Sequence, residues 1–570
     1  MLYSVADTYC SQPDKYQKQM DPLHALPAEI VLRIIDFVDI AGTASLTRTC
    51  KAWHQFIDNT HQEIIYSSPS KTGRQSQDRD LNFLEGKRSF AKYYDGIASW
   101  KELCKRTTLL ERNWTAESPT TRESTIQVGN DPVWRFRADF GRRFIVSTSH
   151  GGGLNVTDMD SGRLLWHLED VRPYAHLEYD MNRGIAVFDR FGNSVEVWRA
   201  DDGDRGSFKL VTVLHHDCET RGYQLSYDTL CVVSTEGQGF VYNMEPEIPC
   251  LVNRISIETE AVGHLDQNED TVMYSMGSKG YHLHAKTEGS LLGTLHPKHC
   301  KELFHIRHPA PDSEDIFSLA GRRPQQEVWP PKNPRKDRLA PLKLERGPHP
   351  DHESLLSVDE DEWGAGMLFE SFMVGVSKAG RVFICSDWRG AVQSSERYAQ
   401  CSAIIECESD GSTFDLGGWL SIRDNHVLFE IDDRVYVFTL TDPAQRALPL
   451  VGEAQPPIYA LSQSSTPRLS IPVSFMAVWD DCLMLTYATL GFREQQSNGH
   501  FDADDGRGAR LRAFPTKVIR VISLAPALYE TNDEAIEKAV QEQDLRGAVD
   551  RMSRPATALE ILLLSNLDQV

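Results

Sequence analysis

The chain has 570 residues, of which 40% are hydrophobic and 25% are charged, so it is long enough for several domains and is not a single small module. Its 82 Asp and Glu residues outnumber its 60 Lys and Arg residues, which gives a formal net charge of −22. An acidic surface repels phosphate backbones and anionic lipids, so the composition argues against a nucleic-acid-binding or membrane-bound protein.

The chain carries no pattern typical of secretion or membrane insertion. No stretch approaches about 18 consecutive apolar residues, and the first twelve residues lack the basic-then-apolar layout of a signal peptide. The eleven cysteines contain no Cys-x-x-Cys pair, which favours buried thiols in a reducing compartment. We therefore expect an intracellular protein, cytoplasmic and/or nuclear, without structural disulfides.

After a polar lead-in at residues 1–20, the segment 21–66 has the apolar periodicity of two helices. The first helix has two apolar faces, one formed by Leu26, Ile30, Ile34 and Val38 and the other by Val31 and Ile35. Gly42 is expected to interrupt the pattern before a second helix begins. About 45 residues bury too little surface to be stable alone, so we expect a partner to cover the exposed apolar positions.

This segment resembles an F-box, and the resemblance includes Glu29 and Asp39 at the family's spacing. Phe37 replaces a more frequent Leu of similar volume. F-box proteins bind a Skp-type adaptor that links them to a cullin ubiquitin ligase. The resemblance implies that the adaptor-binding residues are Leu26, Pro27, Ile30, Ile34, Phe37, Leu46, Cys50 and Trp53. The alternative is an unrelated helical hairpin, because short motifs also match by chance.

Residues 67–114 are predicted to form a linker with helices. Residues 67–79 are rich in Ser, Lys, Arg and Gln, which predicts a mobile loop. Helical periodicity returns from Trp100 to Trp114, where the sequence resembles the linker helix of F-box/WD-repeat proteins and implies a rigid spacer. The basic residues here are better explained by a solvated helical face than by a nucleic-acid site.

Beyond Asn130 the chain consists of short alternating segments separated by Gly, Asp and Ser turns, which predicts an all-β region. A repeat of roughly 40–45 residues with four strands per unit is typical of a β-propeller. Residues 124–129 are expected to supply the outer strand that closes the ring. The predicted third strands of successive units are centred on residues 156, 197, 241, 283, 384, 437 and 521.

These repeats resemble degenerate WD repeats, so residues 124–526 are expected to form a propeller of about seven WD-like blades. Asp158 retains the Asp of the WD dipeptide, Trp198 retains the aromatic residue, and Gly263-His264 matches the Gly-His dipeptide. Later units are more widely spaced, which requires insertions. We expect a disordered insertion at about 308–362, a loop insertion at about 495–510 and a short helical tail at 529–570. The whole resembles the fungal-type F-box/WD-like substrate receptors.

No catalytic, cofactor-binding or metal-binding pattern is found in the sequence. His296, His299, Cys300, His305 and His308 do not have the spacing of a closed zinc site. Gly151-Gly152-Gly153 is followed by no helix and no Lys-Ser/Thr pair, so a hairpin turn explains it better than a phosphate loop. We therefore expect a protein that is not an enzyme and has no cofactor.

The predicted turns between second and third strands carry four basic residues, Arg190, Lys279, Lys378 and Arg434. Such turns share one face of a propeller, where clustered cations suit an acidic or phosphorylated peptide. The alternative, that they are ordinary solvated residues, is favoured because charge placement without a motif is weak support.

The leading hypothesis is a substrate-recognition subunit of a Skp/cullin/F-box ubiquitin ligase, in which the F-box binds the adaptor and the propeller binds the substrate protein. Such a subunit contributes proximity rather than catalysis. The rival hypothesis is a propeller scaffold that binds the adaptor without a role in ubiquitin transfer. A propeller hydrolase would need converging carboxylates or a metal in the central channel.

Overall fold

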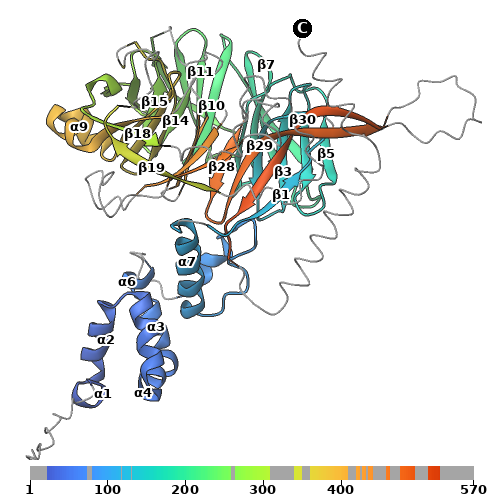
Figure 1. The fold of residues 1–570 in the computed structure, drawn as a ribbon. Helices are drawn as coiled ribbons and strands as arrows, with labels where there is room; N and C mark the ends of the chain where they lie inside the picture. Colours follow the sequence, from blue (N-terminus) through green and yellow to red (C-terminus); the bar gives the residue numbers. More distant parts are fainter. Residues whose placement is uncertain are drawn as a thin grey trace, which may run out of the picture. The chain divides into compact units, whose positions relative to one another are not determined.

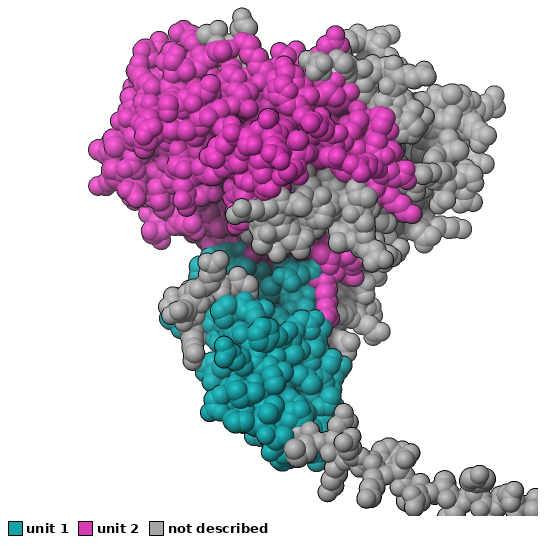
Figure 2. Space-filling view, turned by 90° about the vertical axis from the view of Figure 1, so that its left-hand side faces the viewer, with its two compact units in different colours: residues 1–88, 94–111 teal, residues 89–93, 112–570 magenta. Residues whose placement is uncertain are grey.

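The computed structural model describes residues 22–72, 80–116, 119–129, 131–258, 264–307, 339–348, 358, 360–407, 419–423, 426–431, 434–440, 458–462, 475–494 and 511–526. The predicted lead-in, the 495–510 loop and the 529–570 tail lie outside these residues. The chain divides into two compact units, coloured separately in Figure 2. Unit 1 comprises Met1–Arg88 and Tyr94–Glu111, and unit 2 comprises Ser89–Tyr93 and Arg112–Val570.

Unit 1 is helical in its described residues, and the last helix continues into unit 2. Its elements are α1 (Pro22–Ala25), α2 (Ala28–Asp36), α3 (Ile40–Thr49), α4 (Lys51–His54), the π-helix Gln55–Thr60, α5 (Gln62–Tyr66), α6 (Pro69–Thr72), the 3₁₀-helix Asn82–Glu85 and α7 (Trp100–Trp114). The expected helix over 100–114 is thus present as α7.

The start of the second helix differs from the prediction. We expected Gly42 to break the helical pattern, but α3 begins at Ile40 and runs through Gly42. The Asp39 side chain accepts a hydrogen bond from the Gly42 backbone N–H at 2.7 Å, which caps the helix. The interruption instead falls at Cys50, whose backbone is extended between α3 and α4.

Unit 2 is dominated by β-strands that form four-stranded antiparallel sheets in chain order. The first sheet is β2 (Val133–Asp139), β3 (Phe144–Ser149), β4 (Leu154–Asp158) and β5 (Leu164–Leu168), and the second is β6 (Leu177–Asp180), β7 (Ile185–Phe191), β8 (Ser194–Ala200) and β9 (Phe208–His215). The third is β10 (Thr220–Ser226), β11 (Thr229–Ser234), β12 (Gln238–Asn243) and β13 (Cys250–Ser256), and the fourth is β14 (Leu265–Gln267), β15 (Thr271–Ser275), β16 (Tyr281–Ala285) and β17 (Leu291–Leu295).

The later sheets follow the same order with additions. The fifth is β20 (Trp363–Phe369), β21 (Phe372–Ser377), β22 (Arg381–Cys385) and β23 (Ser402–Glu406), and the sixth is β24 (Leu420–Arg423), β25 (His426–Ile431), β26 (Arg434–Thr439) and β27 (Ile458–Ser462). Helices α8 (Trp388–Gln393) and α9 (Ser395–Cys401) lie between β22 and β23. The last sheet combines β28 (Met476–Trp479), β29 (Cys482–Glu494) and β30 (Leu511–Ser523) with β1 (Arg122–Ile126).

The first strands of these sheets follow one another around a ring. Contacts join β2 to β6, β6 to β10, β10 to β14, β14 to β20, β20 to β24 and β24 to β28, while β2 also contacts β29 and β30. Strand β1 completes the last sheet by pairing antiparallel with β30 over Arg122–Ile126. The body is therefore propeller-like. Each predicted third-strand centre lies within the third strand of its sheet, and the predicted closing segment overlaps β1.

The predicted insertion at 308–362 contains a strand that we did not expect. Strand β19 (Ala340–Arg346) pairs with β18 (Glu302–Arg307) and with β27, and β18 pairs parallel with β23. These two strands join the fifth and sixth sheets into one ten-stranded sheet. Leu342 and Leu344 alternate with charged residues in β19, and Leu344 is buried against the core.

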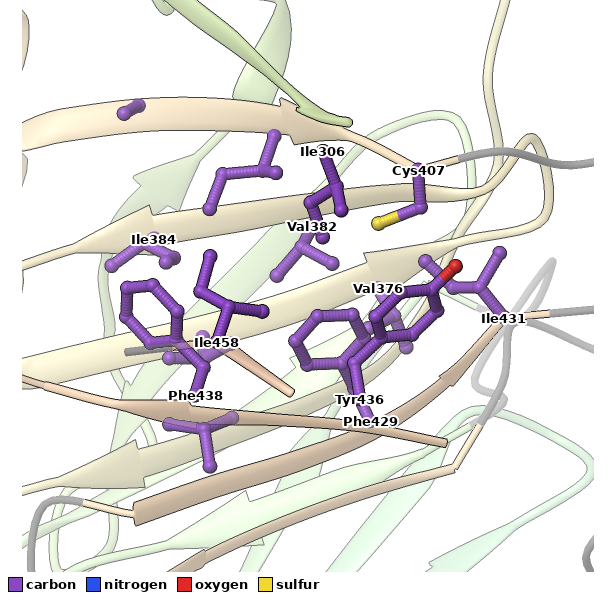
Figure 3. Close-up of a cluster of buried hydrophobic side chains, with 14 of the residues drawn as sticks. Ile306, Val376, Val382, Ile384, Cys407, Phe429, Ile431, Tyr436, Phe438 and Ile458 are labelled. Atoms are coloured by element: carbon purple, nitrogen blue, oxygen red, sulfur yellow. The ribbon is translucent and has the colours of Figure 1, made fainter. Parts of the chain in front are cut away.

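The core of this joined region consists of aliphatic and aromatic side chains from adjacent strands (Figure 3). Phe429 and Tyr436 stack with ring centroids 5.1 Å apart, and Ile306 from β18 belongs to the same cluster. In the last sheet, β29 and β30 pair along thirteen residues and form the long ribbon drawn in orange and red in Figure 1. This pairing brackets the loop insertion that was predicted at 495–510.

Candidate recognition surfaces

One face of α2 is apolar and exposed, while the other face is buried. Val31 and Ile35 are each 1% exposed and form part of the unit 1 core. On the neighbouring apolar face, Leu26 is 38%, Ile30 46% and Ile34 49% exposed, and Phe37 directly after the helix is 88% exposed. The expectation of two apolar faces is confirmed, and one of them lacks cover from the described residues.

The other predicted adaptor-binding residues lie before α2 and along α3 and α4. Pro27 is exposed immediately before α2, and Cys50 is exposed between α3 and α4. Leu46 and Trp53 are half-buried, and the Trp53 ring contacts Phe56 edge-on at 6.3 Å between centroids. The α2 residues are thus the most accessible apolar part of the predicted set.

The C-terminal end of α2 is held by the turn that begins α6. The Lys71 ammonium, 8% exposed as a residue, donates to the Ile35 carbonyl at 2.8 Å. The Ser68 and Ser70 hydroxyls both donate to the Asp36 carboxylate, Ser70 at 2.6 Å. These bonds, from Ser68 first, lower the pKa of Asp36. The sequence analysis missed this arrangement because the partners are more than 30 residues apart.

A buried carboxylate joins α7 to the earlier helices of unit 1. Asp58, 8% exposed, contacts His54 at 3.0 Å, Lys101 at 2.8 Å and the Tyr66 hydroxyl at 3.3 Å. Burial, followed by the negative charge of Asp58, raises the pKa of Tyr66. This network fixes the first turn of α7 within unit 1.

Of the four basic residues predicted in turns, Lys279 and Lys378 lie between a second and a third strand, whereas Arg190 lies near the end of β7 and Arg434 begins β26. Three of them already contact carboxylates: Arg190 binds Asp170 at 3.3 Å, Lys279 binds Glu258 and Lys378 binds Glu362. Arg434 is half-buried at the start of β26. The ion pairs reduce the positive charge that these turns present to an incoming anion.

A second cationic group, formed by Arg135 and Arg137, lies on β2. Arg135 on β2 is 7% exposed and contacts the His176 ring nitrogen at 2.7 Å. Its guanidinium lies over the Trp419 ring at 4.8 Å, and Arg137 lies over Phe475 at 4.1 Å. Among the described residues, Nε of Arg135 has no hydrogen-bond partner. Burial lowers the pKa of Arg135 to about 10.

Aromatic rings extend this group toward the surface. Trp134 contacts His150 at 5.6 Å and Tyr174 at 5.2 Å between ring centroids. Tyr174 is 53% exposed and has a positive φ of 57°, which is uncommon for a residue other than glycine. Burial, followed by the charge of Lys517, lowers the pKa of His150 to about 4. No repeated motif in the sequence indicates that these residues lie together.

No group of three or more metal-ligating residues is found in the described part of the chain. Of the histidine cluster considered above, His296 and His299 have ring centroids 5.7 Å apart, and Nδ1–H of His305 donates to the Gly347 carbonyl oxygen at 3.0 Å. No described helix is both long enough and apolar enough to span a membrane.

Comparison with known proteins identifies no family. No family model matches the chain, and no curated protein matches it. Among solved structures, the computationally designed Ika8 protein covers 63% of this chain and 95% of its own length at 13% identity, with a TM-score of 0.35. Sqt1 from Saccharomyces cerevisiae covers 72% of this chain and 100% of its own length at 9% identity, with a TM-score of 0.41.

Proposed function

We propose that this protein is the substrate-recognition subunit of a Skp/cullin/F-box ubiquitin ligase. The observation that carries the proposal is the exposed apolar face of α2, formed by Leu26, Ile30, Ile34 and Phe37. These residues are four of the eight that the F-box resemblance assigns to the adaptor. Covering such side chains contributes about 1–2 kcal/mol each, so a few of them can dominate the interface.

The proposed role of unit 2 is to bind the substrate protein. Its repeated four-stranded sheets support a WD-like propeller of about seven blades, although the WD dipeptide is preserved only in part. An acidic or phosphorylated peptide remains the proposed ligand of the face that carries Arg190, Lys279, Lys378 and Arg434. Such a peptide has to compete with Asp170, Glu258 and Glu362, which already contact three of these cations.

The adaptor proposal is tested by charge substitution on the exposed face. Ile30→Asp and Ile34→Asp place a carboxylate where an apolar contact is required, without altering Val31 or Ile35 in the core. Each should weaken binding of a purified Skp-type adaptor by roughly 100-fold, as expected for an interface hot spot. Binding is measured by calorimetry on the full chain, with circular dichroism as a check of folding.

Leu291→Asp is a matched control, because Leu291 is 52% exposed on β17 and lies outside unit 1. It should bind the adaptor like the parent protein. Undiminished binding by both α2 variants contradicts the F-box assignment. Capture of the adaptor together with a cullin supports the ligase role, whereas capture of the adaptor alone supports the scaffold alternative.

A further inference from the structure

We propose that Ser68 is a phosphorylation site and that its modification loosens the last turn of α2, which weakens adaptor binding. The effect on the adaptor rests on the function proposed above. The effect on α2 itself does not depend on any partner and can be measured separately.

The sequence around Ser68 is Ser68-Pro69-Ser70-Lys71. A serine followed by proline, with a basic residue three positions after the serine, is the pattern that proline-directed protein kinases modify. Ser118 and Thr466 also precede proline, but neither is followed by a basic residue at that third position. A short motif of this kind needs structural context before it carries weight.

The structure supplies this context, because the motif forms the contact that ends α2. The last carbonyls of a helix have no partner within it and need external donors. Lys71 supplies one such donor to the Ile35 carbonyl, while Ser68 and Ser70 bind the Asp36 carboxylate. The hydroxyls of Ser68 and Ser70 are themselves 2.8 Å apart. Three side chains of the motif therefore hold two consecutive residues of α2.

Ser68 is half-buried, and Pro69 and Ser70 are exposed. In the modification, the Ser68 oxygen forms a bond to the γ-phosphorus of ATP while the bond from that phosphorus to the β,γ-bridging oxygen breaks. ADP is the leaving group, and the hydroxyl proton goes to the catalytic base of the kinase. The phosphoserine carries a charge of about −1.5 to −2 at pH 7.

The charges around Ser68 make a phosphate unfavourable in the observed arrangement. The phosphate replaces a hydroxyl that donates to Asp36, so a hydrogen bond becomes a contact between two anions. Asp39 acts on Lys71 together with Asp36, so the surroundings contain two carboxylates and one ammonium. A phosphate next to an acidic residue disrupts local structure by like-charge repulsion. If it instead attracts Lys71, the Ile35 carbonyl loses its side-chain donor and keeps the Val38 backbone N–H at 3.0 Å.

Either rearrangement frees the end of α2, where two residues of the proposed adaptor-binding face lie. Ile34 is in the last turn, and Phe37 is the residue that caps the helix. Phe37 donates its backbone N–H to the Ile34 carbonyl at 3.1 Å, so its position depends on that turn. Modification of Ser68 therefore acts on the exposed apolar face from the opposite side of the helix.

The test treats the full chain with a proline-directed protein kinase and magnesium ATP, and maps the phosphate by peptide mass spectrometry. Amide hydrogen exchange of residues 33–38 and affinity for the purified adaptor are then measured. We expect phosphate on Ser68, roughly tenfold faster exchange of these amides and roughly tenfold weaker adaptor binding. Ser68→Ala and Pro69→Ala, treated in the same way, should show neither kinase-dependent change.

Two results would overturn the proposal: Ser118 or Thr466 takes phosphate while Ser68 does not, or Ser68 is fully modified and exchange of residues 33–38 is unchanged. If the untreated protein does not bind the adaptor, the proposed ligase function fails, while the exchange measurement still decides the effect of Ser68. Faster exchange with unchanged adaptor affinity contradicts the proposed link between the α2 terminus and the adaptor.

Discussion

The closing of the ring by β1 can be tested through one ion pair. Strand β1 is five residues long, and Ile126 is its only buried residue. In addition to the backbone pairing of β1 with β30, the Glu123 carboxylate on β1 accepts two hydrogen bonds from Arg520. Nε–H donates at 2.5 Å and Nη2–H at 3.0 Å. The Arg520 side chain is 0% exposed and that of Glu123 is 36% exposed. The two partners therefore differ sharply in their access to water.

This difference predicts unequal effects of removing either partner. Glu123→Ala removes the carboxylate that binds the buried Arg520 guanidinium through two hydrogen bonds. The free energy of unfolding of unit 2 should fall by about 2–3 kcal/mol. This loss is smaller than the full cost of breaking a buried ion pair, because Glu123 is partly solvated. Arg520→Met removes the buried charge, and the remaining carboxylate can turn to water. Its loss should be about 1 kcal/mol, including the contact of Arg520 with the Tyr487 ring at 4.7 Å.

The assay is a double-mutant cycle measured by urea unfolding of the full chain, followed by a probe within unit 2 such as tryptophan fluorescence. The double variant should be about as stable as Arg520→Met alone, because once the cation is gone the carboxylate has no role. Amide exchange should accelerate in β1 and β30 before the other sheets. Equal losses for the two single variants, or additive losses in the double variant, would show that this ion pair does not hold the closing strand.

Two further predictions concern unit 2. Burial raises the pKa of the Asp266 carboxyl group from 3.8 to about 7. Between about pH 4 and 7 the native state therefore keeps the carboxyl proton while the unfolded state releases it. The free energy of unfolding consequently falls as the pH rises through this range. Asp266→Asn should therefore gain stability relative to the parent as the pH rises from about 4 to 8, by about 1–3 kcal/mol in urea unfolding; a difference that does not change with pH contradicts a protonated Asp266. Deletion of residues 309–337 should lower the thermal midpoint by at most a few degrees, whereas deletion of 309–346, which removes β19, should lower it further; equal midpoints would mean that β19 contributes nothing.

The β-sheets could be predicted from the sequence because the residue pattern that marks each strand is local. A third strand such as β4, β12 or β26 is a short apolar run between turn residues, and this pattern recurs with the repeat. Strand β19 has the same alternation, but its proline and charged residues, and the charged residues around it, resemble a loop. What defines it as a strand is pairing with β18 and with β27, and the latter lies more than 100 residues further along the chain.

The exposed apolar face of α2 was predictable for a related reason, whereas the contacts that hold the end of this helix were not. Helical periodicity separates Val31 and Ile35 from Ile30 and Ile34, so two apolar faces follow from spacing alone. Burial of only one face is a tertiary property, because it depends on which helices pack against α2. The contacts of Ser68 and Lys71 with Asp36 and Ile35 likewise require the fold.

The basic turns show how position can be predicted while electrostatics is misjudged. Each of Arg190, Lys279 and Lys378 binds an acidic residue that precedes it by 16 to 21 positions. In each case the acidic partner precedes the first strand of the sheet that carries the basic residue. The same pairing therefore recurs in three of the repeats. A search for acidic residues at this offset would have found it. Net charge counted over exposed turns therefore overstates the attraction for an anionic peptide, because these three cations already contact carboxylates. Arg135 differs from these residues, because its described side-chain hydrogen-bond partner is a histidine whose pKa is strongly lowered and not a carboxylate.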